Sequence, residues 1–253
     1  MAASAVIAYV LTAGIATADP AAIMDSHSRL VPGAPPLTID TGDPRAMQIS
    51  AGGDLVFLLA AMPAPVPNGE ADAAAQFSVS AFGTGWKLPA HGGHFILAYR
   101  GDSTLRRDHA LTVFTTVAAA VAEACQAVGI YWGPAGATHE PEFFREIAAQ
   151  ATVQPPVMLW TGVSLARGGG KVSLLSRGLP EQLGLPDLLI EASGKQGNEA
   201  LGFFFDLLGY VVRRNAPFAE GETVGRTATE KLPVRYVASP AGGEAKVMRV
   251  ELK

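Results

Sequence analysis

The stretch from Asp108 to Cys125 constrains the fold more than any other part of the sequence. It has no Asp, Glu, Lys or Arg between Asp108 and Glu123, and its apolar side chains recur at helical spacing, at Leu111, Phe114, Val117, Val121 and Cys125. A helix on the surface of a globular protein normally carries charges on its outer side. We therefore expect this helix to be largely buried. Asp102 or Ser103 stands before it and is predicted to cap its first turn.

Strand and helix signals alternate along the rest of the chain. Asp19-Pro20 is a strong helix start, because Asp can cap the helix and proline fits its first turn, and this helix is predicted to end at Leu30. Further helices are predicted at 70–82, at 139–150 and, capped by Asn198, at 199–213. Strands are predicted at 5–11, 46–50, 55–61, 94–100, 129–132, 157–165, 172–176, 188–192, 234–237 and 246–252.

This mixture of hairpins and strand–helix steps predicts an α+β fold, in which a mixed, largely antiparallel sheet packs against helices. No linker of disordered composition separates the two halves, so we expect one compact unit over residues 1–253. A strand followed by a long helix occurs in each half. This pattern leaves open an arrangement of two similar lobes, residues 1–155 and 156–253.

The first twenty residues have an apolar centre followed by Ala16-Thr17-Ala18, as a secretory signal peptide does. No Lys or Arg precedes Arg29, so the basic start of such a peptide is missing, and we expect an opening buried strand instead. No apolar run approaches the length that spans a bilayer. These features predict a cytoplasmic protein that makes no membrane contact.

Charge and cysteine content exclude several classes of protein. The net charge of −4 and the pI near 5.7 provide no basic surface of the kind that nucleic-acid-binding domains use. The single cysteine, Cys125, excludes an intramolecular disulfide and a cysteine-based zinc cluster, and we interpret it as a buried thiol. No cofactor motif is present, so we expect none to be bound.

Two motifs contain residue types that hydrolases use. His91-Gly-Gly-His94 is the only close histidine pair, but a metal site needs a third ligand, and nothing identifies one. Gly101-Asp102-Ser103 follows a strand and opens a helix, where a nucleophile could stand, although the same residues also suit a helix cap. A hydrolase-like enzyme with a site assembled from His91, His94, Asp102 and Ser103 is therefore the alternative hypothesis for function.

Residues 162–171 contain two weaker signals. Gly162-Val-Ser164 approximates a nucleophile elbow, but an elbow leads directly into a helix, whereas Arg167-Gly-Gly-Gly-Lys171 predicts a hairpin turn. Gly170-Lys171 does not make a phosphate loop, because Val172 stands where Ser or Thr must bind magnesium. In the run 203–205 we expect Phe204 to be buried, and an exposed Phe203 or Phe218 could serve a protein interface.

Several stretches of the C-terminal half resemble one family. They are 185–192, Leu208 and Tyr210 in the following helix, Gly221-Glu-Thr-Val-Gly225, Lys231 with Val234, and 246–252. In these stretches, and in 128–132, the chain resembles the bacterial domain-of-unknown-function family that bears the number 4261. The family tends to have Gly-Asp-Thr-Ile-Gly where this chain has Gly221-Glu222-Thr223-Val224-Gly225. The resemblance implies a bacterial α+β protein and brings no activity or catalytic residue with it.

These observations favour a non-enzymatic binding protein over the hydrolase. Specifically, they predict a bacterial cytoplasmic immunity or adaptor protein that neutralises a secreted, type VI-like toxin by direct binding. Glu220, Glu222, Glu230 and Arg235 are the candidate partner surface, because acidic groups would attract a basic toxin. Residues 220–240 otherwise predict turns and strands, in which Lys231 does not converge with Glu222. A small-molecule sensor domain with an apolar cavity is a third hypothesis.

Overall fold

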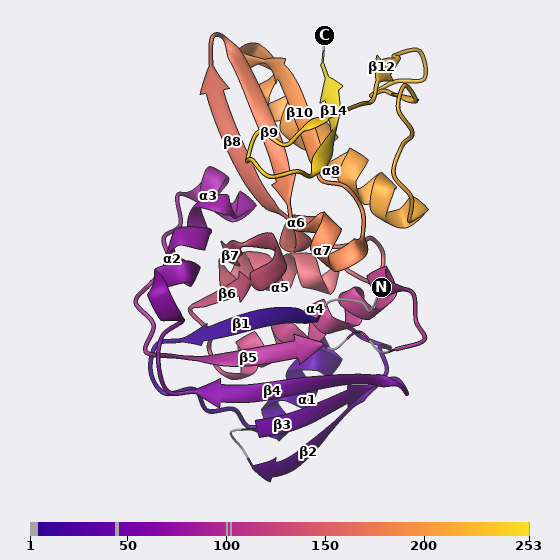
Figure 1. Cartoon of the computed structure of the whole chain (residues 1–253). Helices are drawn as coiled ribbons and strands as arrows, with labels where there is room; N and C mark the ends of the chain where they lie inside the picture. The colour runs from indigo at the N-terminus through magenta and orange to yellow at the C-terminus, as the bar shows by residue number, and fades with distance from the viewer. Residues whose placement is uncertain (1–4, 44–45, 100, 102, 253) are drawn as a thin grey trace.

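The computed structural model describes residues 5–43, 46–99, 101 and 103–252, and these form two large β-sheets that are stacked end to end, with helices around them, and a small two-stranded sheet (Figure 1). The first sheet has seven strands and the second has five. Strands of the first sheet end at His139 and strands of the second begin at Gly162. Most strand pairs are antiparallel, so the α+β fold expected from the sequence is confirmed.

The first sheet has the order β2-β3-β4-β5-β1-β6-β7, and all its pairs are antiparallel. The predicted opening strand forms β1, which lies between β5 and β6 in the interior of the sheet. The sequence did not predict β2, which follows a proline-rich turn. The strands are β1 (Val6–Thr12), β2 (Leu37–Asp43), β3 (Ala46–Ala51), β4 (Leu55–Met62), β5 (Gly93–Tyr99), β6 (Gly129–Trp132) and β7 (Ala137–His139).

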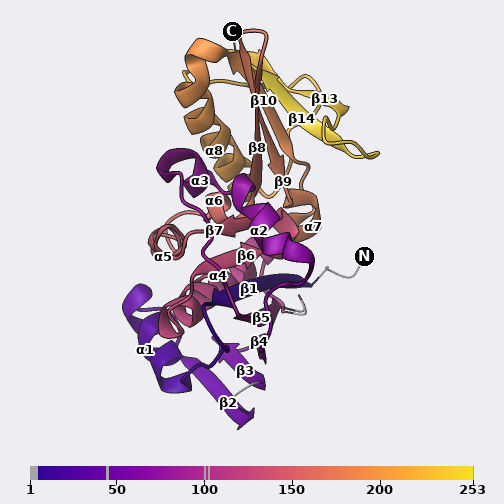
Figure 2. The same ribbon diagram turned by 90° about the vertical axis from the view of Figure 1, so that its left-hand side faces the viewer.

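Helices α1 (Pro20–Leu30), α4 (Arg107–Ala124) and α5 (Pro141–Ala149) pack on one face of this sheet (Figure 2). Asp19 caps α1 by accepting a hydrogen bond from the Ala21 N–H (2.9 Å), as predicted. Helix α4 is buried along most of its length, which confirms the expectation from its uncharged sequence. Its Phe114 packs against Trp132 of β6 with ring centroids 5.2 Å apart.

The predicted cap of α4 is wrong for Ser103, because the helix begins four residues later, at Arg107. Ser103 lies in a turn instead, where its Oγ accepts a hydrogen bond from the Leu105 N–H (3.0 Å) and donates one to Asp54 (3.2 Å). Asp102 lies outside the described residues. The Ser103 hydroxyl, which predicted a helix cap, therefore stabilises a turn instead.

The region predicted as one helix at 70–82 is broken into α2 (Glu70–Ala74), η2 (Ala75–Phe77) and α3 (Val79–Thr84), after the short turn η1 (Pro67–Gly69). The break falls at Ser78, whose backbone is extended (φ −77°, ψ 138°). Its side chain reaches into the core and contacts His139. Tertiary contact therefore overrides local helix propensity here.

The second sheet has the order β13-β14-β10-β9-β8, with β10 and β14 parallel and its other pairs antiparallel. The predicted hairpin turn is confirmed: Gly169 and Gly170, at φ +58° and +74°, connect β8 to β9, and positive φ at both positions favours glycine. The strands are β8 (Gly162–Gly168), β9 (Lys171–Arg177), β10 (Leu188–Ser193), β13 (Arg235–Ala238) and β14 (Lys246–Glu251).

Two further helices accompany this sheet, α7 (Leu179–Leu183) and the long α8 (Gly197–Arg214), which packs on β9 and β10. The helix predicted at 199–213 thus begins two residues earlier, and no side chain caps it. Residues 157–160, predicted as the start of a strand, form the helical turn α6 (Val157–Trp160), and the strand begins at Gly162. His139, predicted to open a helix, belongs to β7.

The two sheets share a pattern of strands and a long helix, although the connections differ, because α2 and α3 stand between β4 and β5, α7 stands between β9 and β10, and β11 (Thr223–Val224), β12 (Leu232–Pro233) and β13 follow α8. Three antiparallel strands, β3-β4-β5 or β8-β9-β10, lead into a helix of 18 residues, α4 or α8. The helix then leads to a strand parallel to the third one. In the second sheet this strand is β14, directly beside β10, whereas in the first sheet β1 is inserted between β5 and β6.

The two sheets meet through a buried glutamine. Gln182 of α7 is 2% exposed, and its Oε1 accepts a hydrogen bond from the Trp132 Nε1–H (2.6 Å). Its Nε2 donates to the carbonyl oxygens of Trp160 (2.7 Å) and Gly178 (3.0 Å). One side chain thus ties β6 of the first sheet to the segments that lead into the second.

Backbone segments approach closely at this junction. A Cβ atom at Gly178 would lie 2.6 Å from the carbonyl oxygen of Pro134, and one at Gly162 would lie 2.4 Å from that of Ala135. Only glycine permits such approaches. The two sheets are therefore in backbone contact across the turn at 133–135.

Candidate functional site

The segment that follows α8 turns back and runs alongside the helix. Phe218 stacks on Tyr210, near the end of α8, with ring centroids 5.6 Å apart and planes within 7° of parallel. Further along the segment, Arg226 forms an ion pair with Glu199, in the first turn of α8 (2.7 Å). The segment therefore returns along the helix from its C-terminal to its N-terminal end.

Two glycines of the stretch Gly221-Glu-Thr-Val-Gly225 shape this segment. Gly221 has φ +83°, and its N–H donates to the carbonyl oxygen of Val234 (2.9 Å). A Cβ atom at Gly225 would lie 2.3 Å from the carbonyl oxygen of Glu230. Between them Thr223–Val224 forms β11, which pairs with Leu232–Pro233 as β12. The prediction of turns and strands for this stretch is confirmed.

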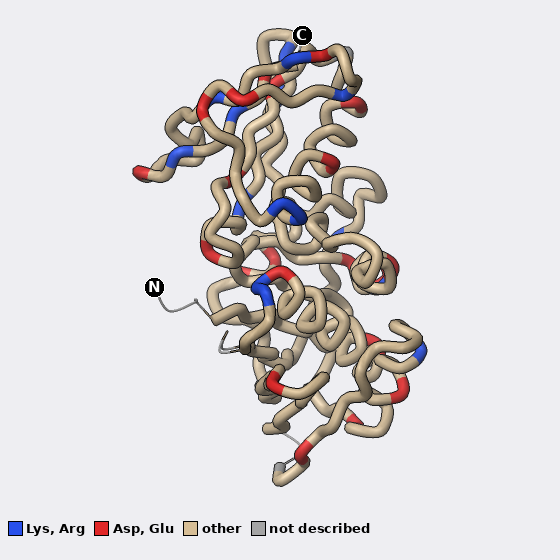
Figure 3. The backbone as a smooth tube through the Cα atoms, turned by 90° about the vertical axis from the view of Figure 1, so that its right-hand side faces the viewer, with Lys and Arg blue, Asp and Glu red and all other residues tan. Residues whose placement is uncertain are grey.

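A cluster of charges holds the loop between β11 and β12 against α8. Arg226 binds the Glu230 carboxylate through its guanidinium, its N–H donates to the same carboxylate (2.7 Å), and its Nη1 reaches Glu199. The hydrogen bonds from Arg226 lower the pKa of Glu230 to about 2. In Figure 3, acidic and basic residues lie close to one another in the upper part of the molecule, which contains the second sheet.

A groove of about 600 Å³ lies between the helix and this segment. Its walls combine aromatic rings with charged groups, and the Arg214 guanidinium lies 5.0 Å from the centre of the Phe218 ring. Asp206 and Arg213 at its margin form no ion pair with another described residue. The groove is lined by Glu199, Gly202, Phe203, Asp206, Leu207, Tyr210, Arg213, Phe218, Thr223, Val224, Gly225 and Arg226.

The four charged residues predicted as a partner surface flank this groove but do not line it. Arg235 forms an ion pair with Glu220 (3.1 Å), which also accepts from the Tyr236 N–H (2.7 Å), and these bonds lower the pKa of Glu220. Glu222 accepts from the Ala219 N–H and from Arg214. Glu230 is held by Arg226. Each carboxylate is therefore engaged by the segment itself or by the end of α8.

Sequence reasoning missed the residues that the groove presents to solvent. Tyr210 is 49% exposed, whereas Phe203 and Phe218, for which exposure was considered, line the groove but are only 8% and 7% exposed. The signal was present in the helix periodicity: Asp206, Tyr210 and Arg213 are spaced i, i+4, i+7. They share a face away from the buried residues of α8, such as Phe204 and Leu208.

The residues of the hydrolase hypothesis are not brought together. His94 opens β5 and Ser103 follows its far end, so the length of the strand, roughly 20 Å, separates them. His91 Nε2 accepts from the Val66 N–H (3.2 Å), and His94 Nδ1 contacts the Ala64 carbonyl oxygen (2.7 Å). Burial lowers the pKa of His94. Each histidine thus organises the loop beside it.

A serine–histidine contact does occur, in the core. The Ser78 Oγ lies 2.8 Å from His139 Nδ1, and His139 Nε2 lies 3.1 Å from the carbonyl oxygen of Leu159. When the neutral His139 ring donates from Nε2 to this carbonyl oxygen, its Nδ1 accepts a hydrogen bond from the Ser78 hydroxyl. Both side chains are 0% exposed, so no substrate can reach them, and burial lowers the pKa of His139 to about 4.

Other groups with shifted pKa values are scattered. Burial raises the pKa of Asp187 to about 6, and this carboxylate accepts from the Ser176 hydroxyl (2.8 Å) beside β10. Cys125, expected to be buried, is partly buried at the end of α4, where desolvation raises the pKa of its thiol to about 12. Active sites gather such groups in one cleft. Here Asp187, Cys125 and His139 lie on different elements.

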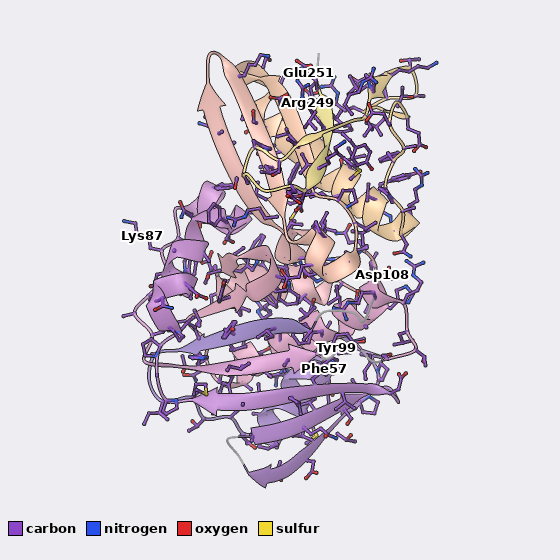
Figure 4. The ribbon with its side chains drawn as sticks, viewed as in Figure 1. Phe57, Lys87, Tyr99, Asp108, Arg249 and Glu251 are labelled. Atoms are coloured by element: carbon purple, nitrogen blue, oxygen red, sulfur yellow. The ribbon has the colours of Figure 1, made fainter. Side chains whose placement is uncertain are left out.

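Elsewhere, charged side chains pair across strands: Arg249 of β14 binds Glu191 of β10 and reaches Glu251 (3.3 Å), and Figure 4 labels Arg249 and Glu251 on their strand. Among the described residues, no group of three or more His, Cys, Asp or Glu side chains could hold a metal ion. Within the same residues, no helix combines the length and apolar character needed to cross a membrane.

Comparison with known proteins links this region to one family. The family model of the domain of unknown function DUF4261 matches residues 177–251, which confirms the resemblance seen in the C-terminal half, whereas the stretch 128–132 lies outside the match. The matched region runs from the end of β9 to the end of β14 and contains α8, the groove and both glycines of 221–225. No curated protein and no solved structure matches the chain significantly.

Proposed function

We propose that this chain is a non-enzymatic bacterial binding protein, an immunity or adaptor protein that acts in the cytoplasm and neutralises a secreted, type VI-like toxin by direct binding. We further propose that the groove beside α8 is its contact surface. The observation that carries the proposal is the composition of this groove, which joins exposed Tyr210 to Phe218, Arg213 and Asp206. Tyrosine, phenylalanine and arginine are enriched at the energetic centres of protein interfaces.

The geometry of the groove supports binding in a second way. Tyr210 and Phe218 already stack on each other in the chain alone, with Arg214 over the Phe218 ring. Ordered aromatic side chains lose little conformational entropy when they are covered. The unpaired charges of Asp206 and Arg213 would add direction to the contact by pairing with opposite charges on the toxin.

The hydrolase alternative gains no support from the geometry. Its residues His91, His94 and Ser103 stand at opposite ends of β5, and the Ser78–His139 pair is closed to substrate. The acidic residues Glu220 and Glu222 add negative charge beside the groove, where they would speed the approach of a basic partner. Glu220 accepts within the segment, and Glu222 accepts within it and from Arg214 of α8.

The test is co-expression of the chain with a toxin encoded next to its gene, followed by titration calorimetry of the purified pair. We expect protection of the host cell, and a Tyr210→Ala variant that binds at least about tenfold more weakly, since interface aromatics of this kind contribute 2 kcal/mol or more. The matched control is Phe82→Ala on α3, an aromatic that is 37% exposed outside the groove. Absence of binding to every neighbouring toxin would refute the proposal.

A further inference from the structure

The groove beside α8 contains two charged side chains that pair with no other described residue. Of its four charged residues, Glu199 and Arg226 pair with each other (2.7 Å), whereas Asp206 and Arg213 form no ion pair within the described part of the chain. Asp206 lies four residues before Tyr210 on the exposed side of α8, so the two side chains are neighbours on the helix surface. An unpaired carboxylate therefore stands beside the half-exposed Tyr210 ring.

The same chain shows what a ring and a neighbouring carboxylate can hold together. The Arg214 guanidinium lies 5.0 Å from the centre of the Phe218 ring, and its Nη2 lies 3.4 Å from the Glu222 carboxylate. This guanidinium therefore contacts a ring face and a carboxylate at once. Arginine is also the cation over two other rings of the described chain, those of Tyr99 (5.2 Å) and Phe77 (4.6 Å). A planar guanidinium can stack on a ring while its N–H groups bond to an acid.

Tyr210 and Asp206 offer the same two groups, and no guanidinium of the described chain lies over this ring. Phe218 stacks on Tyr210, yet 49% of Tyr210 stays exposed to solvent. An apolar side chain placed here would leave the Asp206 carboxylate unpaired, and an acidic one would be repelled by it. A cation over a tyrosine ring and a charged hydrogen bond to a carboxylate are both favourable. The two groups therefore select a side chain with a positive charge on a planar head.

We propose that Tyr210 and Asp206 form the receptor for an arginine side chain of the partner, with the guanidinium over the ring and its N–H groups donating to the carboxylate. This receptor rests on the proposed function and deepens it, because the toxin is the partner that supplies the arginine. The net charge of −4 acts in the same direction, since it favours the approach of basic partners.

Arg213 is a nearby positive charge that opposes a second guanidinium. It lines the groove and also a neighbouring cavity of about 440 Å³ that Gly209 borders. Its Nη1 would lie 3.3 Å from a Cβ atom at Gly209, so its guanidinium leans towards that cavity. Like charges still repel at this range. Removal of the charge by Arg213→Gln should therefore tighten the binding of an arginine side chain at Tyr210 and Asp206.

The probe is N-acetyl-arginine methylamide, which carries the guanidinium without the charged ends of a free amino acid. In nuclear magnetic resonance spectra of the full chain with isotope-labelled tyrosine, five tyrosines give signals, and Tyr210→Phe identifies that of Tyr210. At constant ionic strength we expect this signal to shift saturably, with a dissociation constant on the order of 10 mM. The neutral isostere N-acetyl-citrulline methylamide should bind at least about tenfold more weakly. N-acetyl-lysine methylamide should also bind more weakly than the arginine probe, because its ammonium is a point charge.

Variants separate the receptor from general charge effects. Asp206→Asn should weaken binding of the arginine probe at least about fivefold. The matched control is Asp72→Asn on α2, which removes an exposed carboxylate outside the groove and should leave the affinity unchanged. Both carboxylates are exposed, so both variants should keep the wild-type melting temperature.

A Tyr210 signal that does not shift with the arginine probe up to about 200 mM overturns the proposal. So does equal binding of the citrulline or lysine probe, unchanged affinity in Asp206→Asn, or weaker binding in Arg213→Gln. The probe needs no toxin, so the two failures are distinguishable. Binding of the probe without binding of any neighbouring toxin keeps the receptor and refutes the toxin as partner. A toxin that binds Asp206→Asn as tightly as the wild type overturns the receptor and keeps the proposed function.

Discussion

Replacement of Gln182 by leucine should destabilise the junction between the two sheets. The leucine side chain has a similar size and keeps the site apolar, but it can form none of the three hydrogen bonds of the glutamine amide. The indole N–H of Trp132 and the carbonyl oxygen of Trp160 then remain buried without a partner. The carbonyl oxygen of Gly178 keeps its backbone hydrogen bond from the residue at position 182 (3.3 Å).

The magnitude follows from the two orphaned groups. Each buried donor or acceptor that loses its partner costs about 1–3 kcal/mol, so the free energy of unfolding should fall by about 4 kcal/mol in total. Native domains are stable by only about 5–15 kcal/mol. For a chain of this length each kcal/mol corresponds to about 2–4 °C, so the melting temperature should fall by about 10 °C.

Thermal unfolding followed by circular dichroism measures this shift without relying on the fluorescence of the tryptophans involved. The control is Gln76→Leu, because the Gln76 amide makes a single hydrogen bond at the surface, to the carbonyl oxygen of Ala73 (2.9 Å). This variant should change the free energy of unfolding by less than about 0.5 kcal/mol. A double variant with Trp132→Phe removes the orphaned donor, so its cost should be less than the sum of the two single costs.

Two outcomes would refute this account of the junction. One is a Gln182→Leu variant that melts within about 2 °C of the wild type, which would mean that water or a local rearrangement satisfies both groups. The other is strict additivity with Trp132→Phe. In that case the cost would come from lost packing and not from an unpaired indole.

Further predictions concern pH, the loop beside α8 and the cysteine. The pKa of His139 falls from 6.5 to about 4 in the folded state, so unfolded chains bind more protons between these values, and the contribution of His139 to stability should decline by about 3 kcal/mol as the pH falls from 6.5 to 4. The pKa of Asp187 is raised to about 6 and acts in the opposite direction, so the His139 effect is measured as the difference in pH dependence between the wild type and a folded His139→Ser or His139→Thr variant. Gly225→Ala should cost about 1–3 kcal/mol in urea unfolding, because its Cβ would overlap a loop carbonyl, whereas Gly168→Ala, with open space around it, should cost less. Glu222→Ala should cost no more than about 1 kcal/mol in the same assay, since it removes hydrogen bonds at an exposed turn. The Cys125 thiol, which is partly buried and has its pKa raised to about 12, should react with a thiol reagent at pH 8 much more slowly in the native chain than after denaturant is added, and equal labelling rates would contradict this pKa shift.

Local signals in the sequence predicted most elements, and tertiary contacts account for the failures. Asp19-Pro20 and the hairpin between β3 and β4 depend on neighbouring residues, and both were predicted correctly. Ser78 interrupts a helical stretch because His139, sixty-one residues away, binds its hydroxyl. The run at 157–160 is apolar and short, and periodicity cannot distinguish a strand from a helix at that length.

The candidate site was predictable only in part. Gly221 and Gly225 drew attention to the right segment, because glycines at fixed positions mark backbone constraints. The charged residues Glu220 and Glu230 suggested a partner surface, but counting charges cannot show that each already has an arginine beside it. The groove itself arises when the segment folds back along α8, and sequence spacing alone does not reveal that return.

The position of β14 in its sheet has a consequence for the order in which the chain folds during synthesis. This strand lies between β10 and β13, yet it leaves the ribosome after every other strand of its sheet. The seven-stranded sheet, in contrast, has all its strands once residue 139 has emerged. We therefore expect the nascent chain to complete its first sheet early. When β10 emerges later, one of its edges stays unpaired until β14 follows and completes the second sheet.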